Sequence, residues 1–249
     1  MLENKSDQSL VECIAERVVR VRAGIAVACD KAGRNPEQIE IVTVTKRQPA
    51  CLIRAAYQCG LRVFGENYAE EVLEKKQELA DLSGVQWDMI GHVQSRKAKL
   101  LANEVQRLHS LDSEKLARLF TENRSAELPP LPVLLEVNVS GESSKAGLEG
   151  TDPKSWEQML PLLDQVVSLS RLKLIGLMCM PPLQLDMEVN RLYFRKLRNL
   201  RDFLNTQRPE LDLTELSMGT SSDFPIAIEE GATIIRLGEA ILGPRPIRE

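Results

Sequence analysis

The segment IEIVTVTK at residues 39–46 decides the fold, because the periodicity of the chain changes there. Upstream, apolar residues recur every three or four positions as far as Ala32, which predicts one amphipathic helix at the N-terminus. Gly33 and Pro36 are typical of the end of such a helix. From Ile39 the run is short and rich in β-branched residues, which indicates a buried strand.

The same change from helix to strand recurs along the chain. Segments of strand character lie at residues 39–46, 61–66, 85–91, 105–110, 133–139, 172–179, 214–218 and 232–237. Helical patterns with one apolar face separate them. Alternating strands and helices predict parallel strands joined by right-handed crossovers.

Eight such units in 249 residues favour an α/β fold of one closed (β/α)8 TIM barrel over an open doubly wound sheet. The open-sheet alternative also lacks its phosphate motifs, since no G-x-G-x-x-G follows the first strand and no G-x-x-x-x-G-K-[ST] loop is present. Long Pro- or Ser-rich linkers are missing as well. We therefore expect residues 1–249 to form a single domain, with the N-terminal helix as an extra element.

The composition argues against several classes of partner. A formal net charge of -4 and only 4% aromatic residues disfavour a nucleic-acid partner. The most apolar run, Leu172 to Met180, contains Lys173 and is much shorter than the roughly 20 residues that cross a bilayer, so we expect no membrane association.

Cysteine and histidine usage points to reduced cytosol without a metal site. The five cysteines are odd in number and contain no C-x-x-C pair, which argues against disulfides and against a zinc knuckle. The two histidines are too few for a His-rich metal site, although carboxylates alone could hold magnesium. The N-terminal residues mix charges and lack the apolar stretch of a signal peptide, so we expect a cytoplasmic protein.

In a (β/α)8 barrel the active site lies at the carboxyl ends of the strands. Lys46 ends the first predicted strand and shares a face with Val42 and Val44, so an inward face would place its amine in the barrel mouth. Burial lowers the pKa of a lysine, as an imine-forming amine requires. The alternative is a lysine that reaches solvent or pairs with Glu66.

The ends of the last two predicted strands resemble a phosphate site. Ser217, Gly219 and Ser222 follow the seventh strand, and Gly238 follows the eighth, where barrels of this kind commonly bind phosphate. Asp223 is positioned to cap a short following helix. The alternative is that this segment is only a turn with a helix cap. Taken together with Lys46, the segment fits a phosphorylated aldehyde.

Two further groups of polar residues carry less weight. His92 and Asp112 also lie at strand ends, and each could simply hydrogen-bond a neighbouring loop. The run from Glu70-Glu71 to Lys75-Lys76 places opposite charges four and five residues apart on a helix, which predicts a solvated face without function.

The chain resembles the YggS/PROSC (PLPBP) family of pyridoxal phosphate homeostasis proteins nearly from end to end. The resemblance lies in VTVTK ending at Lys46, FGENY at 64–68, GHVQSRK at 91–97, NVSGESSKAGL at 138–148, GLMCMPP at 176–182, LSMGTSSDF at 216–224 and GATIIRLGEAILGPR at 231–245. The chain departs from the family in having Arg47-Gln48 after the lysine and Thr220 after Gly219. Both departures keep the lysine, serines and glycine.

This resemblance implies a barrel like the N-terminal domain of alanine racemase, with pyridoxal 5'-phosphate (PLP) held as an imine on Lys46. By motif position it implies that Asn67, Ser217, Arg236 and Gly238 lie around the cofactor, and that Ser222 joins its phosphate shell. It also implies vitamin B6 homeostasis rather than an established catalytic activity. The racemase's second domain and opposing base are expected to be absent.

Two main functions remain open, a non-catalytic carrier of PLP and a small PLP enzyme of racemase or lyase type. Racemisation needs acid-base groups on both faces of the substrate, and the chain offers only Tyr68, His92 or a partner subunit for the second. We favour the carrier, acting as a monomer with apo PLP enzymes as possible recipients; a regulatory role is compatible with either function. Arg236, if it points inward, would donate to the cofactor ring and weaken its electron sink, unless it pairs with Glu239 or Glu66 at the rim.

Overall fold

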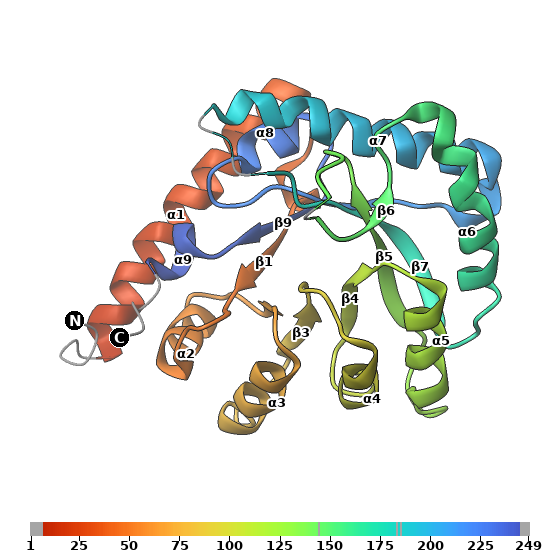
Figure 1. Ribbon diagram of the computed structural model, residues 1–249. Coiled ribbons are helices and arrows are strands. Elements are labelled where there is room, and N and C mark those ends of the chain that lie inside the picture. The colour runs from red at the N-terminus through yellow and green to blue at the C-terminus, as the bar shows by residue number, and fades with distance from the viewer. Residues whose placement is uncertain (1–6, 144, 183, 185, 245–249) are drawn as a thin grey trace.

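The computed structural model describes residues 7–143, 145–182, 184 and 186–244 (Figure 1). Eight parallel strands close into a barrel, because they pair in the order β4-β3-β2-β1-β9-β8-β7-β5 and β5 pairs back with β4. Helices surround the strands in Figure 1. The predicted (β/α)8 barrel is confirmed.

All eight predicted strands are present, and most are slightly shorter than their sequence patterns. They are β1 (Glu40–Val44), β2 (Val63–Glu66), β3 (Gln86–Met89), β4 (Arg107–Leu111), β5 (Leu131–Asn138), β7 (Leu172–Met178), β8 (Glu215–Ser217) and β9 (Ile234–Leu237). The periodicity does not predict β6 (Leu148–Glu149), which pairs with the end of β5 outside the ring, because two residues are too short to show a period.

The helices follow the strands as expected for this fold. They are α2 (Ala50–Gln58), α3 (Ala69–Glu78), α4 (Ala98–Leu101), α5 (Glu114–Asn123), α6 (Leu160–Val167), α7 (Asn190–Gln207), α8 (Phe224–Glu229) and α9 (Glu239–Leu242). In the described part of the chain, none of the helices combines the length and the apolar character needed to cross a membrane.

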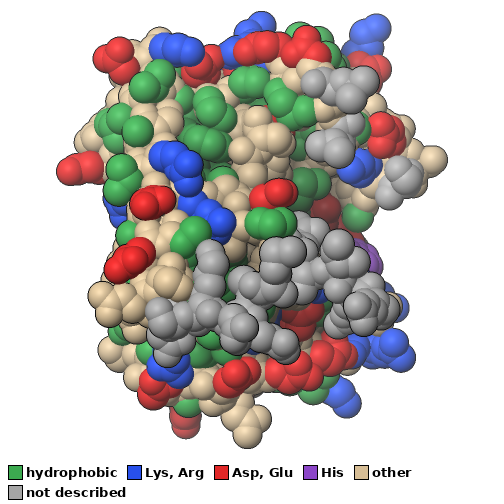
Figure 2. All heavy atoms as spheres, turned by 90° about the vertical axis from the view of Figure 1, so that its left-hand side faces the viewer, with side chains coloured by type: hydrophobic (Ala, Val, Ile, Leu, Met, Phe, Trp, Pro, Cys, Tyr) green, Lys and Arg blue, Asp and Glu red, His purple; other side chains and the backbone are tan. Residues whose placement is uncertain are grey.

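Helix α1 (Asp7–Ala32) is the predicted extra N-terminal helix. It lies along one side of the barrel in Figure 1 and packs against α2, α8 and α9. Its predicted stripe is buried at Ile14, Val18, Val21, Ile25 and Ala28, so the 3.6-residue period located the contact face correctly. Figure 2 views this side of the molecule, and acidic and basic side chains are interspersed over its visible surface.

The hydrophobic core has two parts. The larger part lies between the helices and the outer faces of the strands. The smaller part lies inside the barrel and consists of Val42, Ile90, Leu134, Met178 and Ile234. Val42 therefore points inward, as its place in the first strand predicts.

Next to this small apolar cluster, the barrel interior holds buried charges. Asp88 of β3 is fully buried and accepts hydrogen bonds from Arg107 Nε at 2.8 Å and Gln86 Nε2 at 2.9 Å. Arg107 also forms an ion pair with Glu40. Burial acts to raise the pKa of Asp88, but the hydrogen bond from His109 and the Arg107 guanidinium outweigh it and hold that pKa below its usual range.

The chain of contacts continues across the barrel to β8 and β9. Asp88 Oδ2 lies 3.0 Å from His109 Nε2, His109 Nδ1 lies 2.8 Å from Ser217 Oγ, and Ser217 Oγ accepts from Arg236 Nη1 at 2.6 Å. We assign the proton of neutral His109 to Nε2, because Ser217 can then donate to Nδ1 while accepting from Arg236. We call Glu40, Arg107, Asp88, His109, Ser217 and Arg236 the interior polar chain.

His109 should make stability depend on pH. Burial lowers its pKa to about 4, although the hydrogen bond to Asp88 acts to raise it. The unfolded chain, with an ordinary histidine pKa of about 6.5, then takes up a proton before the folded chain does, so stability is lost as pH falls from about 6.5 towards about 4. Between about pH 7.5 and about pH 4.5 this loss is about 2 kcal/mol.

The test compares urea unfolding of the wild type and His109→Gln at those two pH values. The variant should lose about 2 kcal/mol less than the wild type over the interval, whatever its absolute stability. The wild type measured over the same interval is the control, because the two proteins share every other titratable group. Equal pH dependence in wild type and His109→Gln would contradict the assignment of a neutral, buried imidazole.

Candidate cofactor site

The predicted strand-end residues gather at one end of the barrel, because parallel strands place all their carboxyl ends there. A Cβ on Gly238, after β9, would lie 3.4 Å from the carbonyl oxygen of Val44 at the end of β1. A Cβ on Gly91, after β3, would lie 2.5 Å from the carbonyl oxygen of Asn67, after β2. Neighbouring strand ends thus lie close together, and at Gly91 only glycine leaves room for the approach.

Lys46 lies in a turn just beyond β1 rather than in the strand itself, which corrects the predicted strand limit of residue 46. It is half buried. Val42 lies in the barrel interior, and Val44 packs against the same cluster. The face of β1 that carries these two residues therefore points into the barrel, as expected.

Glu66, the alternative partner of Lys46, is engaged elsewhere. Its Oε1 accepts hydrogen bonds from Thr45 Oγ1 at 2.5 Å and from Lys75 Nζ at 2.6 Å. Burial raises the pKa of Glu66 to about 7, against the Lys75 ammonium that acts to lower it. The prediction of a solvated charged face from Glu70 to Lys76 is therefore wrong at Lys75, which is buried.

Arg236 points into the barrel, as its position in β9 predicts, and is 2% exposed. Its guanidinium donates to Ser217 Oγ at 2.6 Å and to the carbonyl oxygen of Cys179 at 2.8 Å. The alternative of a rim ion pair with Glu66 or Glu239 is not what the structure adopts. Burial lowers the pKa of Arg236, yet a guanidinium stays protonated and can only donate.

Several buried polar atoms towards this end of the barrel have no hydrogen-bond partner among the described residues. Arg236 Nε is an unpaired donor, and Asn67 Oδ1, Glu66 Oε2 and Glu136 Oε2 are unpaired oxygens. Buried polar atoms are normally paired, so an unpaired donor and an unpaired acceptor at the carboxyl ends of β9 and β2 indicate a place for a polar ligand.

The loop after β8 requires glycine at position 219. Gly219 has a φ of +92°, and a Cβ there would lie 2.6 Å from the Cβ of Ala227. Only glycine fits both conditions without strain. Ser221 Oγ accepts from the backbone N–H of Ala240 at 3.1 Å, which joins this loop to the residues after Gly238. Ser222 is exposed, with its hydroxyl 3.3 Å from Thr220 Oγ1.

Asp223 occupies the N-cap position of α8 but does not cap it with its side chain, which corrects that expectation. Its Oδ1 accepts from the backbone N–H of Thr220 at 2.6 Å, and its Oδ2 accepts from Asn190 Nδ2 at 2.8 Å. The carboxylate therefore folds back to fix the loop after β8.

His92 and Asp112 contact each other rather than separate loops. His92 Nδ1 lies 3.0 Å from Asp112 Oδ2. The pair lines a rim hollow of about 450 Å³, together with residues such as Ser113 and Gly147. Asn138, the last residue of β5, uses its Oδ1 to accept from the Ser140 and Gly141 backbone N–H groups.

Several residues of the site are not apparent from the sequence patterns. Glu136 of β5 is half buried, with an unpaired Oε2, and burial together with Asp112 raises its pKa while Arg236 opposes the rise. Glu136 pairs in register with Met178, which lies in the interior cluster, so Glu136 also points inward. A charged residue within an otherwise apolar strand was the available signal, and it applies equally to Asp88 and His109.

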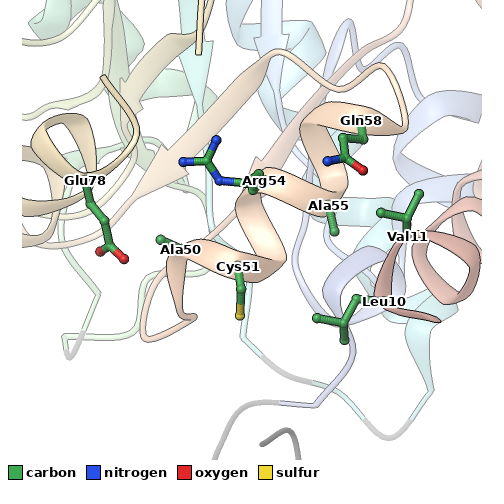
Figure 3. Close-up of a pocket in the computed structure, with 8 residues that line it drawn as sticks. All are labelled: Leu10, Val11, Ala50, Cys51, Arg54, Ala55, Gln58 and Glu78. Carbon is green, nitrogen blue, oxygen red and sulfur yellow. The ribbon is translucent and has the colours of Figure 1, made fainter. Parts of the chain in front are cut away.

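A second pocket lies outside the site. It is formed where α1, α2 and α3 meet and is drawn in Figure 3. Its lining includes Leu10, Cys51 and Glu78 and none of the predicted cofactor residues. Within the described ranges, no group of three or more His, Cys, Asp and Glu side chains is arranged to hold a metal ion.

Comparisons with known proteins agree with this geometry. The family model described as alanine racemase, N-terminal domain, matches residues 20–246. The pyridoxal phosphate homeostasis protein of Pseudomonas aeruginosa is 43% identical over 233 residues, which are 93% of this chain and 96% of that protein. The protein of the same name from Aquifex aeolicus is 41% identical, over 92% of this chain and 97% of its own.

Solved structures give the same result. PipY of Synechococcus elongatus PCC7942, solved with PLP bound, matches with a TM-score of 0.79 at 36% identity, over 92% of this chain and all 100% of that one. Alanine racemase from Corynebacterium glutamicum matches with a TM-score of 0.62 at 13% identity, over 95% of this chain and 62% of the racemase, which is evidence for the fold alone. The chain therefore belongs to the family of pyridoxal phosphate homeostasis proteins, built on the barrel of the alanine racemase N-terminal domain.

Proposed function

We propose that this chain binds PLP at the barrel mouth, attached through Lys46, and serves as a carrier in vitamin B6 homeostasis rather than as a catalyst. When bound, the cofactor supplies an aldehyde that condenses with a primary amine with loss of water, and a ring that takes up electron density. The names of the relatives and the PLP bound to PipY support this function.

The observation that carries the proposal is the unpaired Nε of Arg236 inside the barrel. Arg236 is held by Ser217 and the Cys179 carbonyl, so Nε is a fixed donor available to a ring nitrogen. Asn67 Oδ1 supplies an acceptor at the end of β2, which is separated from β9 by β1 alone. These two groups fit a flat ligand that carries both an acceptor and a donor.

For the phosphate we propose the loops after β8 and β9. Gly219 fixes the course of the loop after β8, Gly238 begins the turn beside β1, and Ser222 adds an exposed hydroxyl. Ser217 contributes indirectly, since its hydroxyl already accepts from Arg236 and so holds that side chain in place. The loops after the last two strands are the usual phosphate site of such barrels.

The nature of Arg236 supports a carrier over an enzyme. A protonated ring nitrogen makes the cofactor a strong electron sink, and enzymes place an acidic group there. A guanidinium can only donate, so Arg236 would keep that nitrogen unprotonated and weaken carbanion formation.

The setting of the protein is part of the same proposal. All five cysteines are free thiols, which suits reduced cytosol. We propose a monomer that releases its cofactor to apo PLP enzymes. Sedimentation of the purified protein and transfer of cofactor to an apo-enzyme would test these two points.

Lys46→Ala should fold and bind PLP without the absorbance band of the lysine-bound form. The interior beneath Lys46 is already filled by Val42 and its neighbours, so the core does not need this side chain. The measurement is the visible spectrum, followed by borohydride reduction and peptide mass analysis. Lys97→Ala is the matched control, since Lys97 pairs with Glu70 and should keep the band. A pyridoxyl mass on Lys97 or Lys145 would relocate the attachment.

PLP should bind at least about 100-fold more tightly than pyridoxal. The difference reflects two or more charge-assisted hydrogen bonds to phosphate, each equivalent to about tenfold or more in affinity. Titration of apo-protein with both vitamers measures it, and inorganic phosphate should compete with PLP. Equal affinity for the two vitamers would remove the phosphate site after β8 and β9 from the proposal.

The loaded protein should show negligible turnover of common amino acids. The sensitive assay is deuterium exchange at the α-carbon in D2O, with Lys46→Ala as the blank. Amines are still expected to displace Lys46 and bleach the band. Sustained Lys46-dependent exchange at about 1 s⁻¹ or faster would establish the alternative function, a small PLP enzyme.

A further inference from the structure

We propose that Lys75 is a positioning residue, which fixes the turn carrying Lys46 through a buried cluster formed with Glu66, Glu71 and Thr45. The inference deepens the proposed function, because the purpose of the turn rests on Lys46 being the attachment residue. We call these four residues the Lys75 cluster.

Lys75 lies on α3, and its ammonium uses all three of its hydrogen-bond donors. It is 7% exposed, and its ammonium has three N–H groups. Nζ lies 2.7 Å from the carbonyl oxygen of Thr45, 2.6 Å from Glu66 Oε1 and 2.7 Å from Glu71 Oε2. The three acceptors come from the turn after β1, from β2 and from α3 itself, so the ammonium joins three elements at one point.

The contacts of the cluster flank Lys46 on both sides. On the preceding residue, Thr45, the carbonyl accepts from Lys75 and the hydroxyl donates to Glu66 at 2.5 Å. On the following residue, the backbone N–H of Arg47 donates to Glu71 Oε2 at 2.8 Å. The peptide segment that carries the Lys46 side chain is thus held at both ends.

The backbone at Arg47 needs such support. Its φ is +58°, in the left-handed region that non-glycine residues rarely adopt. Such a conformation persists only when its surroundings hold it. Burial acts to raise the pKa of Glu71, but its hydrogen bonds from Lys75 and from Arg47 N–H outweigh burial and lower it, so the carboxylate that holds this residue stays ionised.

A contribution to folding stability is a poor explanation for the Lys75 cluster. Replacing a buried group of charges by apolar residues is often neutral or stabilising, because removing charges from water is costly. The cluster gives geometry instead: it determines where the turn lies and in which direction Lys46 leaves it. A residue with that role should affect covalent attachment more than non-covalent binding.

The test separates these two quantities with two ligands. PLP has the aldehyde, whereas pyridoxine 5'-phosphate has an alcohol in its place and binds only non-covalently. Lys75→Met should weaken PLP binding about tenfold or more, the equivalent of one charge-assisted hydrogen bond, and should leave pyridoxine 5'-phosphate within about twofold. Lys76→Met is the matched control: its lysine lies on the same helix, pairs with Glu104 and should affect neither ligand.

A second readout uses apo-protein. Hydrogen exchange of the Arg47 amide should be faster in Lys75→Met than in wild type, and unchanged in Lys76→Met. Thr45→Val, which removes one link without changing charge, should shift both readouts in the same direction by a smaller factor. If Lys75→Met does not fold, the double variant Lys75→Met with Glu66→Gln is used instead. Glu66→Gln removes the buried carboxylate that the single variant leaves unpaired.

Three results would overturn the inference. If Lys75→Met binds PLP as tightly as Lys76→Met does, Lys75 does not position the attachment. If Lys75→Met weakens the binding of both ligands equally, Lys75 has a general structural role. If wild type itself binds both ligands equally, the proposed function fails, and the Arg47 amide then decides separately whether Lys75 fixes the turn: unchanged exchange would overturn the inference as well.

Discussion

Burial of the Arg236 guanidinium determines much of the barrel interior. A charged group removed from water needs partners, and an aliphatic interior offers none. The structure supplies Ser217 and the Cys179 carbonyl, and Ser217 is in turn held by His109 and Asp88. The result is a line of polar side chains through the middle of an otherwise apolar barrel, and it ends at Arg236, whose Nε has no partner among the described residues.

Lys75 and Lys46 have different roles in the structure. Lys75 is fully satisfied by three acceptors and serves as a fixed point. Lys46 leaves a turn whose backbone is held on either side, so its position is set by its neighbours. Under the proposed function, holding the Lys46 amine in this way lowers the entropy cost of its attachment to the cofactor.

The sequence predicts the part of the structure that local periodicity controls. The eight strands and the inward face of Val42 follow from periodicity, whereas the direction of Arg236 stayed open between the interior and a rim ion pair until the structure placed it inside. The strand end at Lys46 is less well predicted, because Arg47 adopts a left-handed turn that β-branched composition does not reveal.

Contacts between distant segments lie beyond that reasoning. The spacing of Glu71 and Lys75 is that of a solvated helix face, yet the turn after β1 covers it. His109 and Ser217 are separated by 108 positions and meet only because the barrel closes. Asp223 has the right position to cap α8, but the backbone N–H of Thr220 and the side chain of Asn190 bind its carboxylate instead.

The interior polar chain connects the two ends of this barrel. In most barrels of this fold the floor supplies stability and the rim supplies chemistry, and the two can be altered independently. Here Glu40 at the start of β1 is linked to Arg236 at the rim through Arg107, Asp88, His109 and Ser217. One continuous chain of ion pairs and hydrogen bonds therefore joins the two ends of this barrel, and the usual separation between them is absent.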